Sequence, residues 1–280
     1  MYATSGFPGR NEVSQSMIQN DFANRYPDYW SQGVWIIPLQ LEGTSPPASL
    51  NLSVVALPSE SVATDFLSLV EQEEYSRFQY PRRRNSYLLG KLAAKLALAR
   101  GDDELSAIAV DHGILNQPIA SGRSSKVTVT HSDTLGAALA YDQRLLAGID
   151  LELINEQARD AMLRITSAEE EGLVRRLGTD IAPTAFLTIL WTAKEAISKV
   201  LQTGFTVAME LFEVKSLERN KYGVVGSFRH FPQLVSVSVV REDYVFSMVL
   251  PAKALAEGEE FRILELMHNR LPVCSIITVD

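Results

Sequence analysis

The sequence predicts an α+β protein built from two similar halves. The main observation is an order of elements that occurs twice: a helical pattern is followed by several short β-prone segments. The second is that each long helical pattern ends at a glycine, Gly101 in one case and Gly204 in the other. We therefore expect antiparallel strands with helices packed on them, in two units that meet near residue 145.

The first half begins with two β-prone segments and continues with two helices. Pro58 to Ser61 is typical of a helix start. The helix after Pro81 carries Leu88, Leu92 and Leu96 on one face. The predicted elements are strands at 34–41 and 50–57, helices at about 58–78 and 85–100, and strands at 107–111, 127–131 and 137–141.

The second half has two clear helix starts. Ser167 and Glu170 form the pattern of a capping box, and Pro183 stands where a first helical turn tolerates proline. The predicted elements are a strand at 145–153, a short helix from 167, a long helix at 183–203, and strands at 222–228, 234–240, 244–250, 261–266 and 275–279.

Composition is that of a globular protein with a large core. Hydrophobic residues make up 46% and charged residues 21%. A net charge of −8 argues against general nucleic-acid binding, and no apolar run is long enough for a membrane span. The only cysteine, Cys274, cannot form an intrachain disulfide, so the simplest setting is a reducing cytoplasm. Residues 1–30 form a polar, irregular leader without a signal-peptide pattern.

Two carboxylates lie on one face of the strand that opens the second half. Because side chains alternate along a strand, Asp150 and Glu152 share a face while Ile149 and Leu151 point into the core. Their positions are about 7 Å apart. Like charges at that spacing repel unless a cation lies between them, so the pair is a candidate metal site. The alternative is a solvated strand face or a salt bridge.

The long helix of the second half has an apolar stripe and a polar face that includes a tryptophan. The stripe is formed by Phe186, Leu190, Ala193, Ile197, Val200 and Leu201, and the opposite face by Trp191, Glu195, Ser198, Lys199 and Gln202, with Lys194 at its margin. A tryptophan on a polar face indicates that this face is covered or lines a cleft. The alternative is that Glu195 and Lys199 form a surface ion pair.

Read together, these segments resemble the 4′-phosphopantetheinyl transferases of the surfactin-synthetase-activating type. The signature is Gly148-x-Asp150-x-Glu152, followed about forty residues later by Trp191-x-x-Lys194-Glu195-x-x-x-Lys199. Further motifs match in the same order, at 87–91 (YLLGK), 116–118 (NQP), 130–132 (THS), 204–205 (GF) and 212–214 (FEV). The resemblance covers roughly residues 60 to 250.

The resemblance implies an enzyme that moves the phosphopantetheine arm of coenzyme A to a serine of an apo acyl or peptidyl carrier protein and releases 3′,5′-ADP. It implies Mg²⁺, with Mn²⁺ as the alternative, held by Asp150, Glu152 and Glu195. Glu195, Lys199 and Asp150 are the implied catalytic residues. The implied coenzyme A contacts are Arg84, Lys91, Thr130, His131, Lys194 and Lys199.

The implied architecture is an intramolecular pseudodimer with the active site between its halves. Residues 31–144 supply nucleotide and phosphate contacts, residues 145–280 supply the metal and catalytic residues, and the chain acts as a monomer. Glu71 and Glu74 lie on a helix where some relatives place lysines, and Gln117 replaces a usual lysine. Two alternatives stay open, and these departures bear on the first. One is a non-catalytic member that binds coenzyme A or carrier protein. The other is a different Mg²⁺-dependent phosphotransferase, for which no glycine-rich phosphate loop is present.

Overall fold

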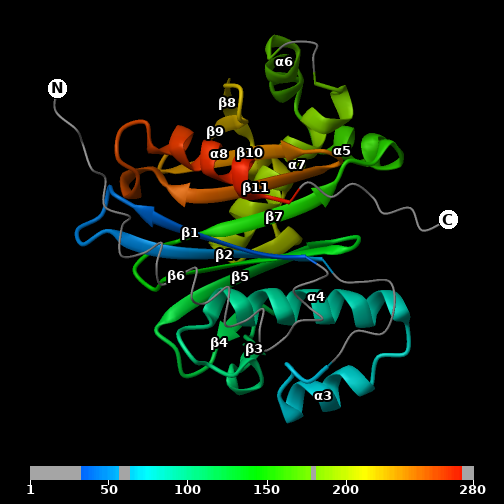
Figure 1. Cartoon of the computed structure of the whole chain (residues 1–280). Coiled ribbons are helices and arrows are strands. Elements are labelled where there is room, and N and C mark those ends of the chain that lie inside the picture. Colours follow the sequence, from blue (N-terminus) through cyan, green and yellow to red (C-terminus); the bar gives the residue numbers. More distant parts are fainter. Residues whose placement is uncertain (1–32, 57–63, 178–180, 273–280) are drawn as a thin grey trace.

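Two antiparallel sheets with helices packed on their faces form the fold, which confirms the predicted α+β class (Figure 1). The computed structural model describes residues 33–56, 64–177 and 181–272. The predicted leader, the strand expected at 275–279, Cys274 and the helix start at 58–61 lie outside these residues. Among the described helices, none has the length and apolar character that a membrane crossing requires.

The first sheet has the strand order β1-β2-β6-β5 and is covered by α4, with α3 beyond it (Figure 1). Its elements are β1 (Val34–Leu41), β2 (Ala48–Ala56), α3 (Leu69–Ser76), α4 (Pro81–Leu98), β5 (Ser125–Ser132) and β6 (Leu135–Asp142), with the small hairpin β3 (Val110–His112) and β4 (Pro118–Ala120) inserted before β5. The predicted strand at 107–111 is therefore only partly correct, because Leu105–Ala107 forms a 3₁₀ turn.

The second sheet has the order β7-β11-β10-β9-β8 and is covered by α7. Its elements are β7 (Gly148–Leu153), α5 (Arg159–Arg164), α6 (Ala168–Arg176), α7 (Pro183–Leu201), β8 (Val214–Arg219), β9 (Val224–Phe228), β10 (Leu234–Arg241), β11 (Tyr244–Pro251) and α8 (Glu259–Arg270). The strand expected at 261–266 is wrong, because these residues lie within α8. The expectation of two helix-and-sheet halves is compatible with this arrangement.

The core joins the two sheets rather than separating them. Alternate residues of β6 and β7, such as Leu139 and Ile149, pack in one cluster with β11 and with Leu264 of α8. Glu259 at the start of α8 also accepts hydrogen bonds from the Glu42 backbone N–H, at 3.0 and 3.2 Å. The opposite faces of the sheets are left for α4 and α7, and this fixes which side chains of β7 face α7.

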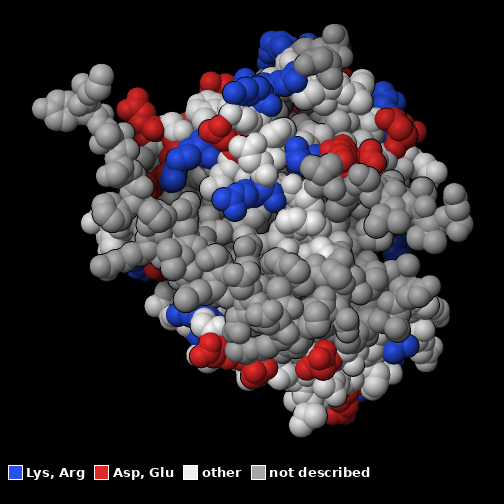
Figure 2. Space-filling view, in the orientation of Figure 1, with Lys and Arg blue, Asp and Glu red and all other residues white. Residues whose placement is uncertain are grey.

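The outer surface carries charges of both signs. On the face shown in Figure 2, the visible basic and acidic side chains of the described residues lie intermixed rather than in one continuous basic field. Several are paired locally, for example Arg77 with Glu73 at 2.6 Å. Such exposed pairs contribute little to stability.

Candidate active site

The two sheets meet at their edge strands, β5 and β7, and side-chain hydroxyls bridge them. Thr130 Oγ accepts a hydrogen bond from the Leu151 backbone N–H at 3.3 Å, and Ser132 Oγ accepts one from the Leu153 N–H at 3.2 Å. Each hydroxyl satisfies an edge N–H that would otherwise lack a partner in a sheet ladder. We call this junction of β5 and β7 the seam, and the predicted acids lie on it.

Asp150 is the most buried of the acids, with 3% of its surface exposed. Its Oδ1 accepts hydrogen bonds from Thr130 Oγ and Lys199 Nζ, both at 2.8 Å. Its Oδ2 is buried and has no hydrogen-bond partner among the described residues. A buried carboxylate oxygen without a donor is costly, so this atom is suited to a ligand that brings positive charge.

Helix α7 brings Glu195 and Lys199 to the same place. Its expected stripe is correct, since Phe186, Leu190 and Ile197 are buried. The alternative of a surface ion pair between Lys199 and Glu195 is not what the structure has. Lys199 Nζ instead donates to Asp150 Oδ1 and to the Ile149 carbonyl at 2.9 Å, which ties α7 to β7.

Gly148 permits this close contact between α7 and β7. A Cβ built on Gly148 would lie 2.1 Å from the Ala196 carbonyl oxygen, which is backbone and cannot turn aside. Gly148, the first residue of the predicted signature, is therefore needed for the close approach of the two elements. It sets how near Glu195 and Lys199 come to Asp150.

We expect Gly148→Ala to destabilise the protein by about 1–3 kcal/mol, because α7 must shift to admit the methyl group. The shift should also reduce any activity of this site, since Lys199 would separate from Asp150. Urea unfolding would measure the loss of stability. Gly122→Ala is a useful control, because a Cβ there meets no atom within 4 Å, although its φ of +72° adds some strain of its own. Equal unfolding midpoints for Gly148→Ala and the wild-type protein would contradict this account of the glycine.

Burial and nearby negative charge raise the pKa of Glu152 and of Glu195. Burial raises the pKa of Glu195 to about 8, and the negative charges of Asp150 and Glu152 add to the shift while Lys199 opposes it. Burial and the charge of Asp150 also raise the pKa of Glu152, and hydrogen bonds from Ser132 and Trp191 oppose that rise. Trp191 thus contributes its indole N–H to the polar face on which it was predicted. A cation bound here would therefore favour the ionised forms of both glutamates.

The donor set fits a hard divalent cation. The three acids offer only oxygen, which Mg²⁺ and Mn²⁺ prefer, and Asp150 Oδ2 is buried and unpartnered. As placed, no three His, Cys, Asp or Glu side chains of the described residues converge on a single point. The fit therefore rests on the chemistry of the donors and on their mutual repulsion, which a bound cation would relieve.

The first half of the chain carries His131 and two arginines that are candidates for binding an anion. His131 is exposed, but desolvation by the surrounding protein lowers its pKa, and the positive charges of Lys199 and Arg83 lower it further. The Arg84 guanidinium lies 4.5 Å from the centre of the Tyr75 ring, and that of Arg83 lies 4.9 Å from the centre of the Phe78 ring. Both arginines are exposed and are available to an anion.

Two predicted phosphate-binding lysines are engaged inside the protein. Lys194 is 1% exposed, and its Nζ donates to Glu170 Oε2 at 2.8 Å and to the Ile165 carbonyl at 2.7 Å. Lys194 therefore faces α6 and not the seam. This placement does not support its expected contact with a phosphate. Thr130 is likewise buried, and its hydroxyl serves Asp150 and Leu151.

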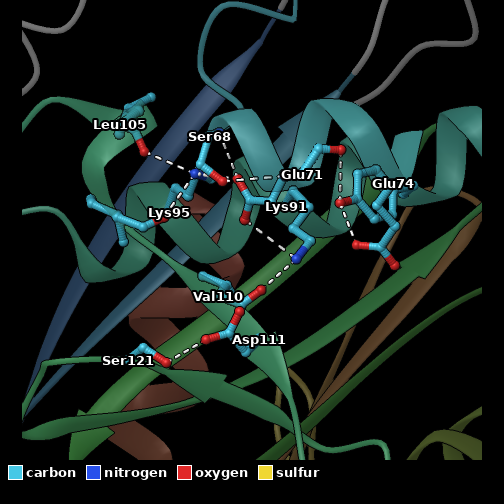
Figure 3. Close-up of polar contacts among 11 residues, drawn as sticks. Ser68, Glu71, Glu74, Lys91, Lys95, Leu105, Val110, Asp111 and Ser121 are labelled. Atoms are coloured by element: carbon cyan, nitrogen blue, oxygen red, sulfur yellow. Dashed lines mark hydrogen bonds and ion pairs between the residues drawn. The ribbon is translucent and has the colours of Figure 1, made fainter. Parts of the chain in front are cut away.

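Lys91 belongs to a buried network around Glu71 (Figure 3). Its Nζ donates to the Val110 carbonyl and lies 3.3 Å from Glu71 Oε1. The neighbouring Lys95 is 0% exposed and pairs with Glu71 Oε2 at 2.6 Å. Lys91 thus holds α4 to β3, and its placement does not support the expected contact with coenzyme A.

Sequence reasoning missed Ser132 as a member of the site. It lies within the 130–132 motif, but the motif by itself assigns it no role. A signal was present, because Thr130 and Ser132 have the same two-residue spacing as Asp150 and Glu152 and therefore share one face of their strand. What the sequence did not show is that the two strands lie edge to edge.

Comparison with known families agrees with this site. Residues 147–249 match the model of the 4′-phosphopantetheinyl transferase superfamily. The matched segment covers less than half of the chain, but it contains Asp150, Glu152, Glu195 and Lys199. Comparison with curated proteins gives no match.

Proposed function

We propose that the chain transfers the 4′-phosphopantetheine arm of coenzyme A to a serine of an apo acyl or peptidyl carrier protein, in the manner of the surfactin-synthetase-activating type. The observation that carries the proposal is Asp150, which is buried with an unpartnered Oδ2 beside Glu195 and Lys199. All of these residues lie in the segment that matches the superfamily.

The residues that would hold the divalent cation are Asp150, Glu152 and Glu195. When bound, the cation supplies positive charge to the diphosphate of coenzyme A and to the departing phosphate. The raised pKa values of Glu152 and Glu195 support this role, because burial and, after it, the negative charge of Asp150 disfavour their ionised forms, and a bound cation would favour those forms. Mg²⁺ is the expected ion, with Mn²⁺ as the alternative.

The reaction is an in-line displacement at phosphorus. The carrier serine oxygen forms a bond to the phosphorus that carries pantetheine, and the bond from that phosphorus to the bridging oxygen breaks, so that the electron pair leaves with 3′,5′-ADP. Glu195 accepts the serine proton, directly or through a water. Lys199 holds Asp150 in place and adds a positive charge next to the transferred group.

The first half contributes the remaining cations of the proposed site. His131, Arg83 and Arg84 are accessible from the side of β5 and the start of α4, and they replace Lys91 and Lys194 as candidates for the phosphates of coenzyme A. Residues 31–144 would thus bind the nucleotide, and residues 145–280 would supply the acids. Because one polypeptide supplies both sides of the seam, we propose a monomer, acting in the cytoplasm.

Intact-protein mass spectrometry of an apo carrier protein would test the proposal. After incubation with this chain, coenzyme A and Mg²⁺, the carrier should gain the mass of one phosphopantetheine, and EDTA should prevent the gain. Carriers from fatty-acid, polyketide and peptide synthesis should be compared. No gain with any of them, while coenzyme A remains bound and intact, would overturn the transferase and favour a non-catalytic binder. The internal engagement of Lys91 and Lys194 is the observation that favours that second candidate.

A further inference from the structure

We propose that Ser132 is a positioning residue: it fixes the carboxylate of Glu152 from the opposite side of the seam. The inference rests on the proposed function, because it concerns an acid of that site. It adds a residue of the first half whose effect on the reaction passes through Glu152 and not through contact with a substrate.

The hydrogen bonds of Ser132 carry the inference. Its Oγ accepts the Leu153 backbone N–H at 3.2 Å and donates to Glu152 Oε2 at 2.8 Å. Thr130 makes the same pair of contacts two residues earlier on both strands. Its hydroxyl accepts from the Leu151 N–H at 3.3 Å and donates to Asp150 Oδ1 at 2.8 Å. Two hydroxyls on one strand thus serve two carboxylates and two amides on the other.

A hydroxyl that accepts from an amide has its only proton free for another partner. The Leu153 N–H orients the Ser132 oxygen, and the single O–H is then directed to Glu152. Glu152 needs such a donor more than Asp150 does, because its side chain is longer and only half-buried. Without Ser132, the Trp191 indole remains as its neutral donor, and one donor fixes a carboxylate less firmly than two.

The same contact couples the two sheets to the site. Glu152 belongs to the second sheet, but Ser132 of the first sheet orients its carboxylate. The position of this carboxylate therefore depends on the relative placement of the two sheets. Asp150 has an additional anchor within the second half, Lys199, and Glu152 has no such lysine at hydrogen-bond distance among the described residues. Loss of Ser132 should therefore affect Glu152 more than loss of the Thr130 hydroxyl affects Asp150.

Three variants test the inference: Ser132→Ala removes the hydroxyl, Ser132→Thr restores it, and Ser125→Ala is the matched control on the same strand. Ser125 Oγ contacts Arg100 at 2.7 Å and lies at the other end of β5. The first readout is the Mg²⁺ concentration that gives half of the thermal stabilisation in the absence of substrates. We expect Ser132→Ala to raise it about tenfold or more, and Ser132→Thr to restore it within about threefold.

Amide exchange and kinetics supply two further readouts. The Leu153 amide should exchange faster in Ser132→Ala while the Leu151 amide is unchanged, since only the former loses its acceptor. In the transfer assay, the Mg²⁺ requirement of Ser132→Ala should rise while the KM for coenzyme A stays within about twofold. Ser125→Ala should match the wild-type protein in all three.

The outcomes separate this inference from the proposed function. If the wild-type protein transfers phosphopantetheine and Ser132→Ala has an unchanged Mg²⁺ requirement, Ser132 does not position Glu152 and the inference is overturned alone. A failure of Ser132→Thr to restore Mg²⁺ binding, with the Leu153 amide protected again, would overturn it equally. If the wild-type protein shows neither transfer nor stabilisation by Mg²⁺, the proposed function itself is overturned.

Discussion

Replacement of Glu195 by glutamine should reduce transfer by about 10³-fold or more and leave the protein folded. In the proposed function, the change removes both the proton acceptor and a ligand of the cation, and each contributes a large factor to such a reaction. The side chain lies on the polar face of α7 and not in its buried stripe, and glutamine keeps its shape. Steady-state rates with coenzyme A and apo carrier would measure the loss.

The same substitution should stabilise the metal-free protein at high pH. Glu195 titrates near 4.5 when unfolded and near 8 in the fold, so the folded state binds this proton more tightly. Stability therefore falls as the pH rises from about 5 through 8, and the loss is complete above 8. Glutamine does not ionise, so Glu195→Gln should exceed the wild-type protein by roughly 1–3 kcal/mol at pH 8.5 and by little at pH 5.

Urea unfolding in EDTA at both pH values would measure this difference, with Glu218→Gln as the control. Glu218 is exposed on β8 in the same sheet, and its replacement should change neither stability nor transfer. Addition of Mg²⁺ at pH 8.5 should stabilise the wild-type protein and reduce the advantage of Glu195→Gln. Retention of most of the transfer activity by Glu195→Gln would remove Glu195 from the catalytic assignment, whatever its effect on stability.

The geometry of the acids could be predicted because it depends on local periodicity. The two-residue period of a strand places Asp150 and Glu152 on one face, and the structure directs the intervening Leu151 into the core. The helical period of α7 similarly places Glu195 and Lys199 together. What brings the two elements together is Gly148, whose missing Cβ is visible in the sequence but whose contact with Ala196 is not.

The partners of the lysines could not be predicted. Lysines such as Lys194 and Lys91 can bind a phosphate, but in the fold each lies next to a carboxylate. Lys194 pairs with Glu170, and Lys91 lies next to Glu71. These acids lie 24 and 20 positions away in the sequence, on separate helices. The sequence shows which groups can pair, and only the packing of α3 and α6 decides which pairs form.

The prediction of secondary structure was wrong where a short apolar run fits both a strand and a helix. The residues from Phe261 to Leu266 alternate enough to resemble a strand, yet they lie in α8. The decisive signals are at the ends of the helix: acids in its first turn, Glu259 and Glu260, and basic residues in its last turn. Strand β8 was missed for the opposite reason, because an edge strand with exposed positions shows little apolar pattern.

Removal of the Glu71 carboxylate should cost about 3–5 kcal/mol, the expected effect of leaving buried charges without their partner. Glu71 Oε2 pairs with Lys95, which is fully buried, and Oε1 lies near Lys91 (Figure 3). Glu71 also forms the capping box of α3 with Ser68. Glu71→Ala therefore leaves two ammonium groups with only backbone carbonyls as acceptors, and it weakens the start of α3.

The pH dependence of stability identifies the charge as the cause. Burial alone would raise the pKa of Glu71, but Lys95, the Ser68 N–H and Lys91 outweigh it and lower the value below 4.5. A lowered folded pKa means that the stability is present above pH 4.5 and is lost as the pH falls through the folded value. Glu71→Gln should therefore lose stability at pH 7 and show a weaker decline than the wild-type protein as the pH falls below 4.5.

Glu73→Ala is the matched control for this network. It lies on the same helix, but it pairs with Arg77 at the surface, where the Glu73 side chain is 69% exposed, so its loss should cost less than about 1 kcal/mol. Equal unfolding midpoints for Glu71→Ala and Glu73→Ala would show that the buried pairs contribute nothing. The double variant Glu71→Leu/Lys95→Met should recover part of the loss, because it leaves one buried ammonium group, that of Lys91, without a carboxylate instead of two.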